Sequence, residues 1–437
     1  MRSLVLFFAI MIVTPSILIL PHLGVLVWTW ISIMNPHRLS WGFTDDIPFV
    51  LIIASVTLVA WLVSKEPKTP PSRLLMWVAF AFVIQMTVSS ITALHPTTTW
   101  LLWENTLKTF ALFFFAATVI RTKVRIQALL WIIAISLGFY ATRGVMNTLT
   151  SGGKTVLVGP AMSMLADNNH LALSLVMLLP ILNYLRITST NKLVRSVLIV
   201  VLIFTIVSVI TSYSRGALIA LAVAAFALMK SGKGRVTVIV LLAIVSITTV
   251  NLMPEKWQER VLSMESSESI QEDASFSNRL DAWSVSWKLA ISRPLTGGGF
   301  RAIEHAETFS RFMPEATRGI AAHSIYFQVL GEHGFIGLVL YLIMLAAAWF
   351  HLRRTESRVR GQPRLDWAAQ LARMLQVSIL CFAVGGAALS IAYHDLILLI
   401  LVISMNLDVL TEEKVVGTDA PFLPSNQRYD PQMQKEF

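Results

Sequence analysis

Apolar runs of about 20 residues recur along most of the chain, and each run ends at polar or charged residues. A helix needs about 20 apolar residues to cross the ~30 Å hydrocarbon layer of a membrane. Hydrophobic residues make up 55% of the chain and charged residues 14%, with a mean hydropathy of +0.67. A soluble domain carries about 25% charged residues. The sequence therefore predicts an all-α polytopic membrane protein.

The runs predict twelve transmembrane helices if Met1–Met34, which contains two prolines, is counted as one kinked span. A span followed by a re-entrant piece is the other interpretation of this stretch. The count divides the chain into N-terminal transmembrane helices (1–252), a long polar loop (253–322), C-terminal transmembrane helices (323–410) and a polar tail (411–437). The predicted spans are 1–34, 47–63, 74–94, 99–120, 126–141, 170–185, 194–211, 215–229, 235–252, 323–350, 367–390 and 391–410.

The net charge of +10 comes from Lys and Arg residues that are spread over short loops. This distribution is typical of the positive-inside rule, so we predict no nucleic-acid partner. The loop between the spans at 323–350 and 367–390 is the most basic, and we assign it to the cytoplasm. Counting back places the basic loops near 65–73, 121–125, 186–195 and 230–235 on the same side. Both termini are then cytoplasmic, and the long polar loop is outside.

One amphipathic segment stands out in the long polar loop. Residues 278–291 carry apolar residues, Trp283 and Trp287 among them, at helical spacing. We expect a helix in the outer membrane interface, with both tryptophans at headgroup depth. Arg279 precedes Trp283 by four residues and shares its face. The Gly297–Gly299 run that follows lacks the Lys-Ser/Thr of a phosphate-binding loop, so we interpret it as a turn.

His323 lies where the long loop returns to the membrane. An imidazole with a pKa near 6.5 can accept a proton from a hydroxyl group at neutral pH, which suits a general base. The alternative is a structural residue beside a helix N-cap, whose ring binds a loop carbonyl. The residue alone does not decide between these interpretations.

Several outer arginines are candidate ligands for a phosphate group. Arg215 opens a span, and its planar guanidinium matches a phosphate, although such side chains also extend to lipid headgroups. Arg279 and Arg301 are candidates for a second contact, but a solvated loop charge is the favoured interpretation of Arg301. Arg143 is a weaker candidate, at the start of an outer loop. Tyr213 stands in the same turn as Arg215, and we include it among the substrate-binding candidates.

The sequence gives no strong metal signal. Asp45 and Asp46 form the one acidic pair on a short outer loop, and a helix N-cap is the favoured interpretation. Cys381 is the single cysteine, so neither an intramolecular disulfide nor a cysteine metal cluster can form. Residues 168–170 could line a sugar site, but they fit a helix cap better. We therefore predict no metal and no cofactor.

Four short motifs carry a resemblance to a known family. They are Ser212-Tyr-Ser-Arg215-Gly-Ala217, Arg279-x-x-x-Trp283, Pro294-Leu-Thr-Gly297-x-Gly299 and Ala322-His-Ser324. In this order they resemble the O-antigen ligases and Wzy polymerases of bacterial envelopes. The opening, which includes Asn35-Pro-His-Arg38-Leu-Ser-Trp41, resembles the branch of exosortase-associated O-glycosylation ligases. The similarity extends over most of residues 1–410.

The resemblance implies a twelve-helix enzyme of the bacterial inner membrane with a large periplasmic loop and a periplasmic active site. It implies a glycan donor linked to undecaprenyl diphosphate, an acceptor hydroxyl on the lipid A core, and a metal-independent, inverting reaction among membrane lipids. By similarity, His323 is the base, and Arg215 and Arg279 hold the diphosphate. The roles of Arg143 and Arg301 come from the residues alone.

Two alternatives remain open at this stage. A polymerase or a protein O-glycosylation ligase uses the same donor and differs in its acceptor. A flippase or transporter of lipid-linked glycans would explain the spans and the outer cations without any base.

Overall fold

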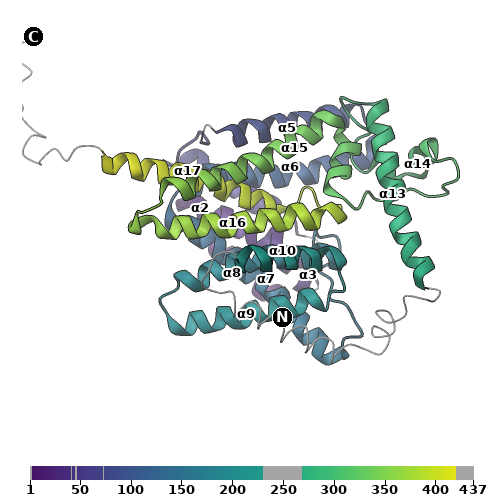
Figure 1. Ribbon diagram of the computed structural model, residues 1–437. Coiled ribbons are helices and arrows are strands. Elements are labelled where there is room, and N and C mark those ends of the chain that lie inside the picture. The colour runs from purple at the N-terminus through teal and green to yellow at the C-terminus, as the bar shows by residue number, and fades with distance from the viewer. Residues whose placement is uncertain (1, 41, 45–46, 72, 230–267, 420–437) are drawn as a thin grey trace, which may run out of the picture.

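The computed structural model describes residues 2–40, 42–44, 47–71, 73–229 and 268–419 (Figure 1). Every regular element in this part of the chain is a helix. The helices are α1 (Arg2–Ile19), α2 (Pro21–Met34), α3 (Pro36–Ser40), α4 (Phe49–Val63), α5 (Leu74–Ile91), α6 (Pro96–Val119), α7 (Lys123–Ser151), α8 (Asn168–Thr188), α9 (Lys192–Ile210), α10 (Arg215–Met229), α13 (Glu268–Ser292), α14 (Ala306–Phe312), α15 (Ile325–Arg358), α16 (Asp366–Gly385) and α17 (Asp395–Asp419), with short 3-10 turns η1 (Ala302–Glu304), η2 (Pro363–Leu365) and η3 (Gly386–Ala388).

Seven helices of the described residues are long and apolar enough to cross a membrane. They are α1, α5, α7, α8, α9, α15 and the segment Pro363–Ala388, and three shorter apolar helices (α2, α4 and α10) accompany them. The prediction of a helical polytopic membrane protein is confirmed. The count of twelve is not confirmed, because it took residues 1–34 as one span and because the expected span at 235–252 lies outside the described residues.

The sequence left open whether the first 34 residues form one kinked span or a span with a re-entrant piece, and in the structure they form two helices, α1 and α2. The chain breaks at Leu20, since Pro21 has no backbone N–H and disfavours helical geometry in the residue before it. Ser3 near the start of α1 donates a hydrogen bond to the carbonyl of Ser40, which follows α2. The chain therefore reverses at Leu20, and its beginning lies at the same end of the bundle as α3. The prediction that the N-terminus is cytoplasmic counted residues 1–34 as one span, and the two helices remove the basis of that prediction.

Helix α13 crosses one end of the bundle, roughly perpendicular to most of the other helices (Figure 1). It includes the predicted helix 278–291 and packs against α15 and α14. Trp287 is exposed, but Trp283 is half-buried against the chain that leads into α15. The ring of Trp283 therefore packs against protein, and the expected headgroup depth of the two tryptophans stays a prediction.

Helix α15 is kinked at Gly334, where φ is +70° and ψ is −168°. The kink frees the carbonyls of Gly331 and Glu332, which accept hydrogen bonds of 2.9 Å from the N–H groups of Gly298 and Gly299. A Cβ at Gly334 would lie 2.5 Å from the Pro294 carbonyl oxygen, so only glycine allows this close approach. The N–H group of Gly297 donates to the carbonyl of Arg293 at 2.9 Å, so the glycine run is a turn whose three N–H groups are all bound and unavailable to a phosphate.

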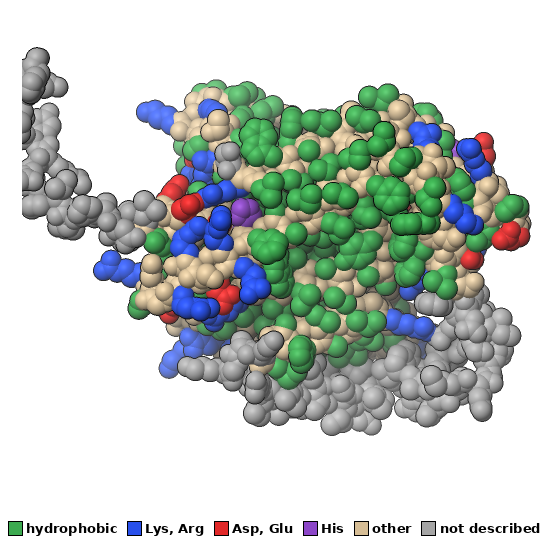
Figure 2. Space-filling model, turned by 45° about the horizontal axis from the view of Figure 1, so that its top comes forward, with side chains coloured by type: hydrophobic (Ala, Val, Ile, Leu, Met, Phe, Trp, Pro, Cys, Tyr) green, Lys and Arg blue, Asp and Glu red, His purple; other side chains and the backbone are tan. Residues whose placement is uncertain are grey.

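The basic loops gather at the other end of the bundle. Arg125 pairs with Glu66 at 2.6 Å, and buried Asp408 pairs with Arg358 at 2.8 Å and Arg73 at 3.9 Å. These contacts join three of the loops that span counting placed together, and the predicted loop near 230–235 lies outside the described residues. Figure 2 shows apolar side chains over the middle of one face and Lys and Arg near the C-terminal end.

Helix α17 continues past the predicted tail boundary at 411 to Asp419.

Candidate active site

His323 lies immediately before α15, at the end of the bundle that α13 crosses. Its φ of +45° is left-handed, which costs a non-glycine residue ~1–2 kcal/mol. Its backbone N–H donates a hydrogen bond of 2.8 Å to Ser390 Oγ, which helps to hold this conformation. The residue is exposed, and no described residue forms a hydrogen bond with its ring. The backbone is therefore fixed while the imidazole remains available.

Trp283 of α13 holds the other side of the same peptide unit. Its Nε1 donates a hydrogen bond of 2.8 Å to the carbonyl of Ala322. The indole stacks on Phe327, with the ring centroids 5.0 Å apart and the planes inclined by 8°. Because the Ala322 carbonyl and the His323 N–H belong to one peptide bond, Trp283 and Ser390 clamp that bond from two directions.

Arg279 lies one helical turn before Trp283, on the same face of α13. The pKa of His323 is below its usual value, mainly because surrounding protein atoms desolvate the ring and next because of the positive charge of Arg279; the carboxylate of Asp167 opposes this shift. Burial of the ring is partial, since the residue as a whole is exposed. A lowered pKa keeps the imidazole neutral at pH 7, so a ring nitrogen can accept a proton.

The turn that precedes Arg215 is fixed by polar contacts. Tyr213 has a φ of +56° and donates a hydrogen bond of 2.8 Å to the carbonyl of Gly153. Asn168 at the start of α8 donates one of 2.9 Å to the carbonyl of Ser212. Burial raises the pKa of Tyr213, so its hydroxyl stays neutral. Arg215 itself begins α10 and is exposed.

The short connection after α16 lies between this turn and His323. A Cβ built on Gly216 would lie 3.5 Å from the Cβ of Ala388, so the start of α10 packs directly on the connection. Two residues further on, Ser390 binds the backbone of His323. Asp167, next to the start of α8, also acts electrostatically on His323. These links bring the start of α10 and His323 to the same end of the bundle and to the same connection.

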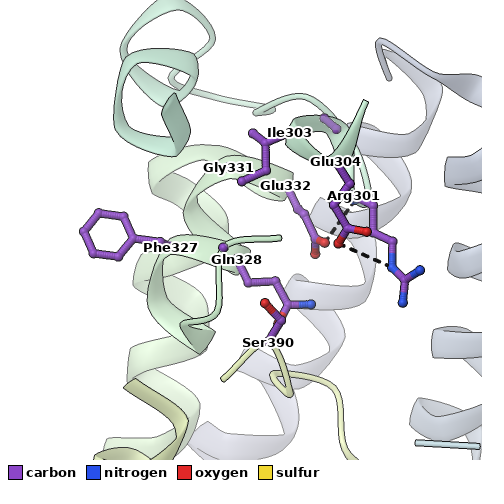
Figure 3. Close-up of a pocket in the computed structure, with 10 residues that line it drawn as sticks. Arg301, Ile303, Glu304, Phe327, Gln328, Gly331, Glu332 and Ser390 are labelled. Carbon is purple, nitrogen blue, oxygen red and sulfur yellow. Dashed lines mark hydrogen bonds and ion pairs between the residues drawn. The ribbon is translucent and has the colours of Figure 1, made fainter. Parts of the chain in front are cut away.

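Arg301 is paired with a carboxylate. Its Nε lies 3.6 Å from Glu304 Oε1, and its backbone N–H donates a hydrogen bond of 3.0 Å to Glu332 Oε1. Figure 3 shows both contacts as dashed lines, to Glu304 and to Glu332. The nearby carboxylates offset its charge, which favours the interpretation as a loop charge over that as a diphosphate ligand.

Arg143 was predicted to start an outer loop, and this was wrong. The helix α7 continues to Ser151, because the polar residues at its end still form helical hydrogen bonds beyond the apolar run. The guanidinium of Arg143 lies over the ring of Phe139, 5.8 Å from its centroid. The described contacts do not join Arg143 to His323. Asp45 and Asp46, the acidic pair singled out in the sequence, lie outside the described residues.

Three polar residues of this site were missed in the sequence. Glu332 is buried in α15, and its Oε2 accepts a hydrogen bond of 2.6 Å from the hydroxyl of Tyr393. An acidic residue within an apolar span is a functional candidate by default, so the sequence contained a signal for Glu332. Gln328 accepts the N–H of Ala392 at 3.2 Å. Ser390 and Gln328 carry no such signal, because their partners are more than 60 residues away in the chain.

Comparison with known protein families gives a match for the region of the chain that contains His323. Residues 198–342 match a family model described as O-antigen ligase. This region is an O-antigen ligase domain, which supports membership of the O-antigen ligase and Wzy polymerase family. The matched O-antigen ligase region includes Arg215, Arg279, Arg301 and His323. Residues 1–190 match a family of unknown function (DUF5935), and no curated protein sequence matches the chain.

The O-antigen ligase domain supports glycosyl transfer of the ligase or polymerase type in lipopolysaccharide biosynthesis. Together with the apolar helices, it indicates a multi-pass bacterial membrane protein. The O-antigen ligase match ends within α15, so Ser390 and Tyr393 reach the site from outside it.

The electrostatics of His323 generate a prediction. Diethyl pyrocarbonate modifies neutral imidazole, so the pH at which His323 becomes reactive reports its pKa. Arg279→Gln removes a charge that lowers this pKa and should move the midpoint of modification to higher pH. Asp167→Asn removes a charge that raises it and should move the midpoint to lower pH, while asparagine still caps α8. Mass spectrometry of the His323 peptide measures both midpoints.

Lys288→Gln provides the matched control. Lys288 lies on the same helix as Arg279, but its ammonium group donates to the carbonyl of Phe312 and does not contribute to the His323 shift. Its removal should leave the midpoint in place. Equal midpoints in wild type and Arg279→Gln would show that Arg279 does not act on His323.

Proposed function

We propose that this protein transfers a glycan from undecaprenyl diphosphate to a sugar hydroxyl of the lipid A core, at the periplasmic face of the bacterial inner membrane. The observation that carries the proposal is an exposed imidazole with a lowered pKa beside Arg279, within an O-antigen ligase domain. The end of the bundle that holds it lies opposite the end where the basic loops gather. By the positive-inside rule, the basic end faces the cytoplasm.

In the proposed reaction, His323 accepts the proton of the acceptor hydroxyl. The acceptor oxygen then attacks the anomeric carbon of the donor glycan, and the bond from that carbon to the diphosphate oxygen breaks. The undecaprenyl diphosphate leaves with the electron pair of that bond, and His323 later releases its proton to water. Because attack and departure occur on opposite faces of the anomeric carbon, the configuration inverts.

The proposed leaving-group site consists of Arg215 and Arg279. A planar guanidinium binds two phosphate oxygens at once, and fixed positive charge stabilises the charge that develops on the departing diphosphate. The donor is already activated by its diphosphate, so we propose that these side chains replace a metal ion. Tyr213 supports this site as a positioning residue, because its bond to Gly153 fixes the turn before Arg215.

The experiment that tests the function is reconstitution in lipid vesicles with a defined polyprenyl-diphosphate glycan. Lipid A core, free glycan and a serine-containing peptide are offered side by side, with and without EDTA. We expect glycosylated lipid A core in both conditions. A lengthened glycan would identify a polymerase, and a modified peptide a protein O-glycosylation ligase. Donor that changes leaflet without forming any product would indicate a transporter and contradict the proposal.

His323→Ala should lower the rate of transfer by roughly 10²–10⁴-fold, which is the usual contribution of a general base. The rate is measured in the same vesicles, and the melting temperature in detergent checks the fold. His305→Ala is the control, because His305 lies in the same polar segment and stacks on His95 at 3.7 Å. Full turnover by His323→Ala would remove the base from the mechanism.

Arg215→Lys keeps the positive charge but loses the planar fork. If the guanidinium binds the diphosphate, we expect a roughly 10–100-fold loss of rate, since one charged hydrogen bond is worth ~1.5–3 kcal/mol. Arg311→Lys, at an exposed position of α14, is the matched substitution and should retain normal rates. Unchanged turnover by Arg215→Lys would mean that this side chain serves only to reach lipid headgroups.

A further inference from the structure

Figure 3 shows a small pocket. Two of its lining residues adjoin the backbone of His323, since Ala322 precedes it and Ser390 accepts its N–H. About 250 Å³ of space lies between and in front of the pocket walls, open solvent included, and only a small part of this space is enclosed. Its walls come from the 301–304 stretch, the first two turns of α15, Ala322 and Ser390. Ala322 precedes His323, and Ser390 binds its N–H, so the pocket shares two of its walls with the proposed base.

Several polar groups that line the pocket have hydrogen-bonding capacity to spare. Oε1 of Gln328 accepts the N–H of Ala392, which fixes the orientation of the amide and leaves its NH2 group without a described partner. Ser390 Oγ accepts the N–H of His323 and can still donate its own hydrogen. Glu304 contacts Arg301 through Oε1, and its second oxygen remains an acceptor. The pocket thus offers both donors and acceptors.

The charges of the pocket separate it from the proposed diphosphate site. Two carboxylates, Glu304 and Glu332, and one guanidinium, that of Arg301, line it. A diphosphate placed there would meet the carboxylate of Glu304, which already pairs with Arg301, and like charges in close contact are unfavourable. The cation that acts on His323 is Arg279, which is not a lining residue. The pocket therefore suits an uncharged ligand with several hydroxyl groups.

We propose that this pocket binds hydroxyl groups of the acceptor sugar, next to the hydroxyl that reacts, through the Gln328 amide and the Glu304 carboxylate. The proposal rests on the proposed function. An inverting base must lie on the acceptor side of the anomeric carbon, and the pocket adjoins His323. The space between its walls is about that of one water molecule, so one hydroxyl group can enter it while the rest of the sugar ring stays at its open mouth.

Gln328→Glu tests the proposal. The new carboxylate keeps an oxygen for the N–H of Ala392 but replaces the NH2 donor by an acceptor. We expect the KM for the acceptor to rise roughly tenfold, while kcat and the KM for the donor change less than about twofold. An acceptor analogue that lacks the hydroxyl group bound by Gln328 should have the same KM with the wild type and with Gln328→Glu. The hydrogen bond between Gln328 and the acceptor is absent in both cases.

Glu304→Ala is the second variant, since Glu304 is exposed and its loss should not impair folding. Glu304→Ala should raise the KM for the acceptor. It should not change the KM for an acceptor analogue that lacks the hydroxyl group bound by Glu304, which is a different group from the one bound by Gln328. Gln362→Glu makes the same chemical change as Gln328→Glu in the loop before α16 and should leave both KM values unchanged. Melting temperatures in detergent confirm that each variant is folded.

The outcomes separate this inference from the proposed function. If wild type forms product and both pocket variants keep a normal acceptor KM, the subsite is wrong and the function stands. A rise in the donor KM alone would also overturn the subsite. If wild type forms no product with any acceptor, both proposals are wrong.

Discussion

The connection between α16 and α17 must satisfy its backbone polar groups without a helix, and the rest of the site depends on how it does so. Inside an apolar bundle, each unpaired N–H or carbonyl is costly. Side chains from the other helices supply the partners. Gln328 accepts the N–H of Ala392, and the hydroxyl of Tyr341 donates to the carbonyl of the same residue at 3.0 Å. Through Ser390, this connection in turn fixes the backbone of His323.

Charge is divided around His323 in a way that fits its proposed chemistry. Arg279 approaches from α13, where Trp283 anchors the helix to the chain before His323. The carboxylates Glu304 and Glu332 lie together in the adjoining pocket. In the proposed reaction the leaving group is an anion and the acceptor is a neutral alcohol. Positive charge on one side of His323 favours the anion, and uncharged or acidic groups on the other side do not attract it into the acceptor pocket.

Much of this arrangement could be predicted from the sequence, for identifiable reasons. Apolar run length fixes the helices, and the spacing of Arg279 and Trp283 places both on the face of α13 toward His323. The break at Leu20 was harder, because a kinked span and a hairpin have the same apolar pattern. The end of α7 was missed since a helix that leaves the apolar layer loses its hydrophobic signature. The bonds of Ser390 could not be predicted, because they join residues far apart in the chain.

The boundaries of the family matches bear on what defines the site. The O-antigen ligase match ends at residue 342, yet the hydroxyl that holds His323 belongs to Ser390. His323 has a left-handed backbone that is unfavourable by itself, so the matched segment alone lacks one of the two bonds that clamp it. The other bond, from Trp283 to Ala322, lies within the matched segment. The motifs therefore supply the side chains of the proposed mechanism, and the C-terminal helices supply part of the geometry that holds His323.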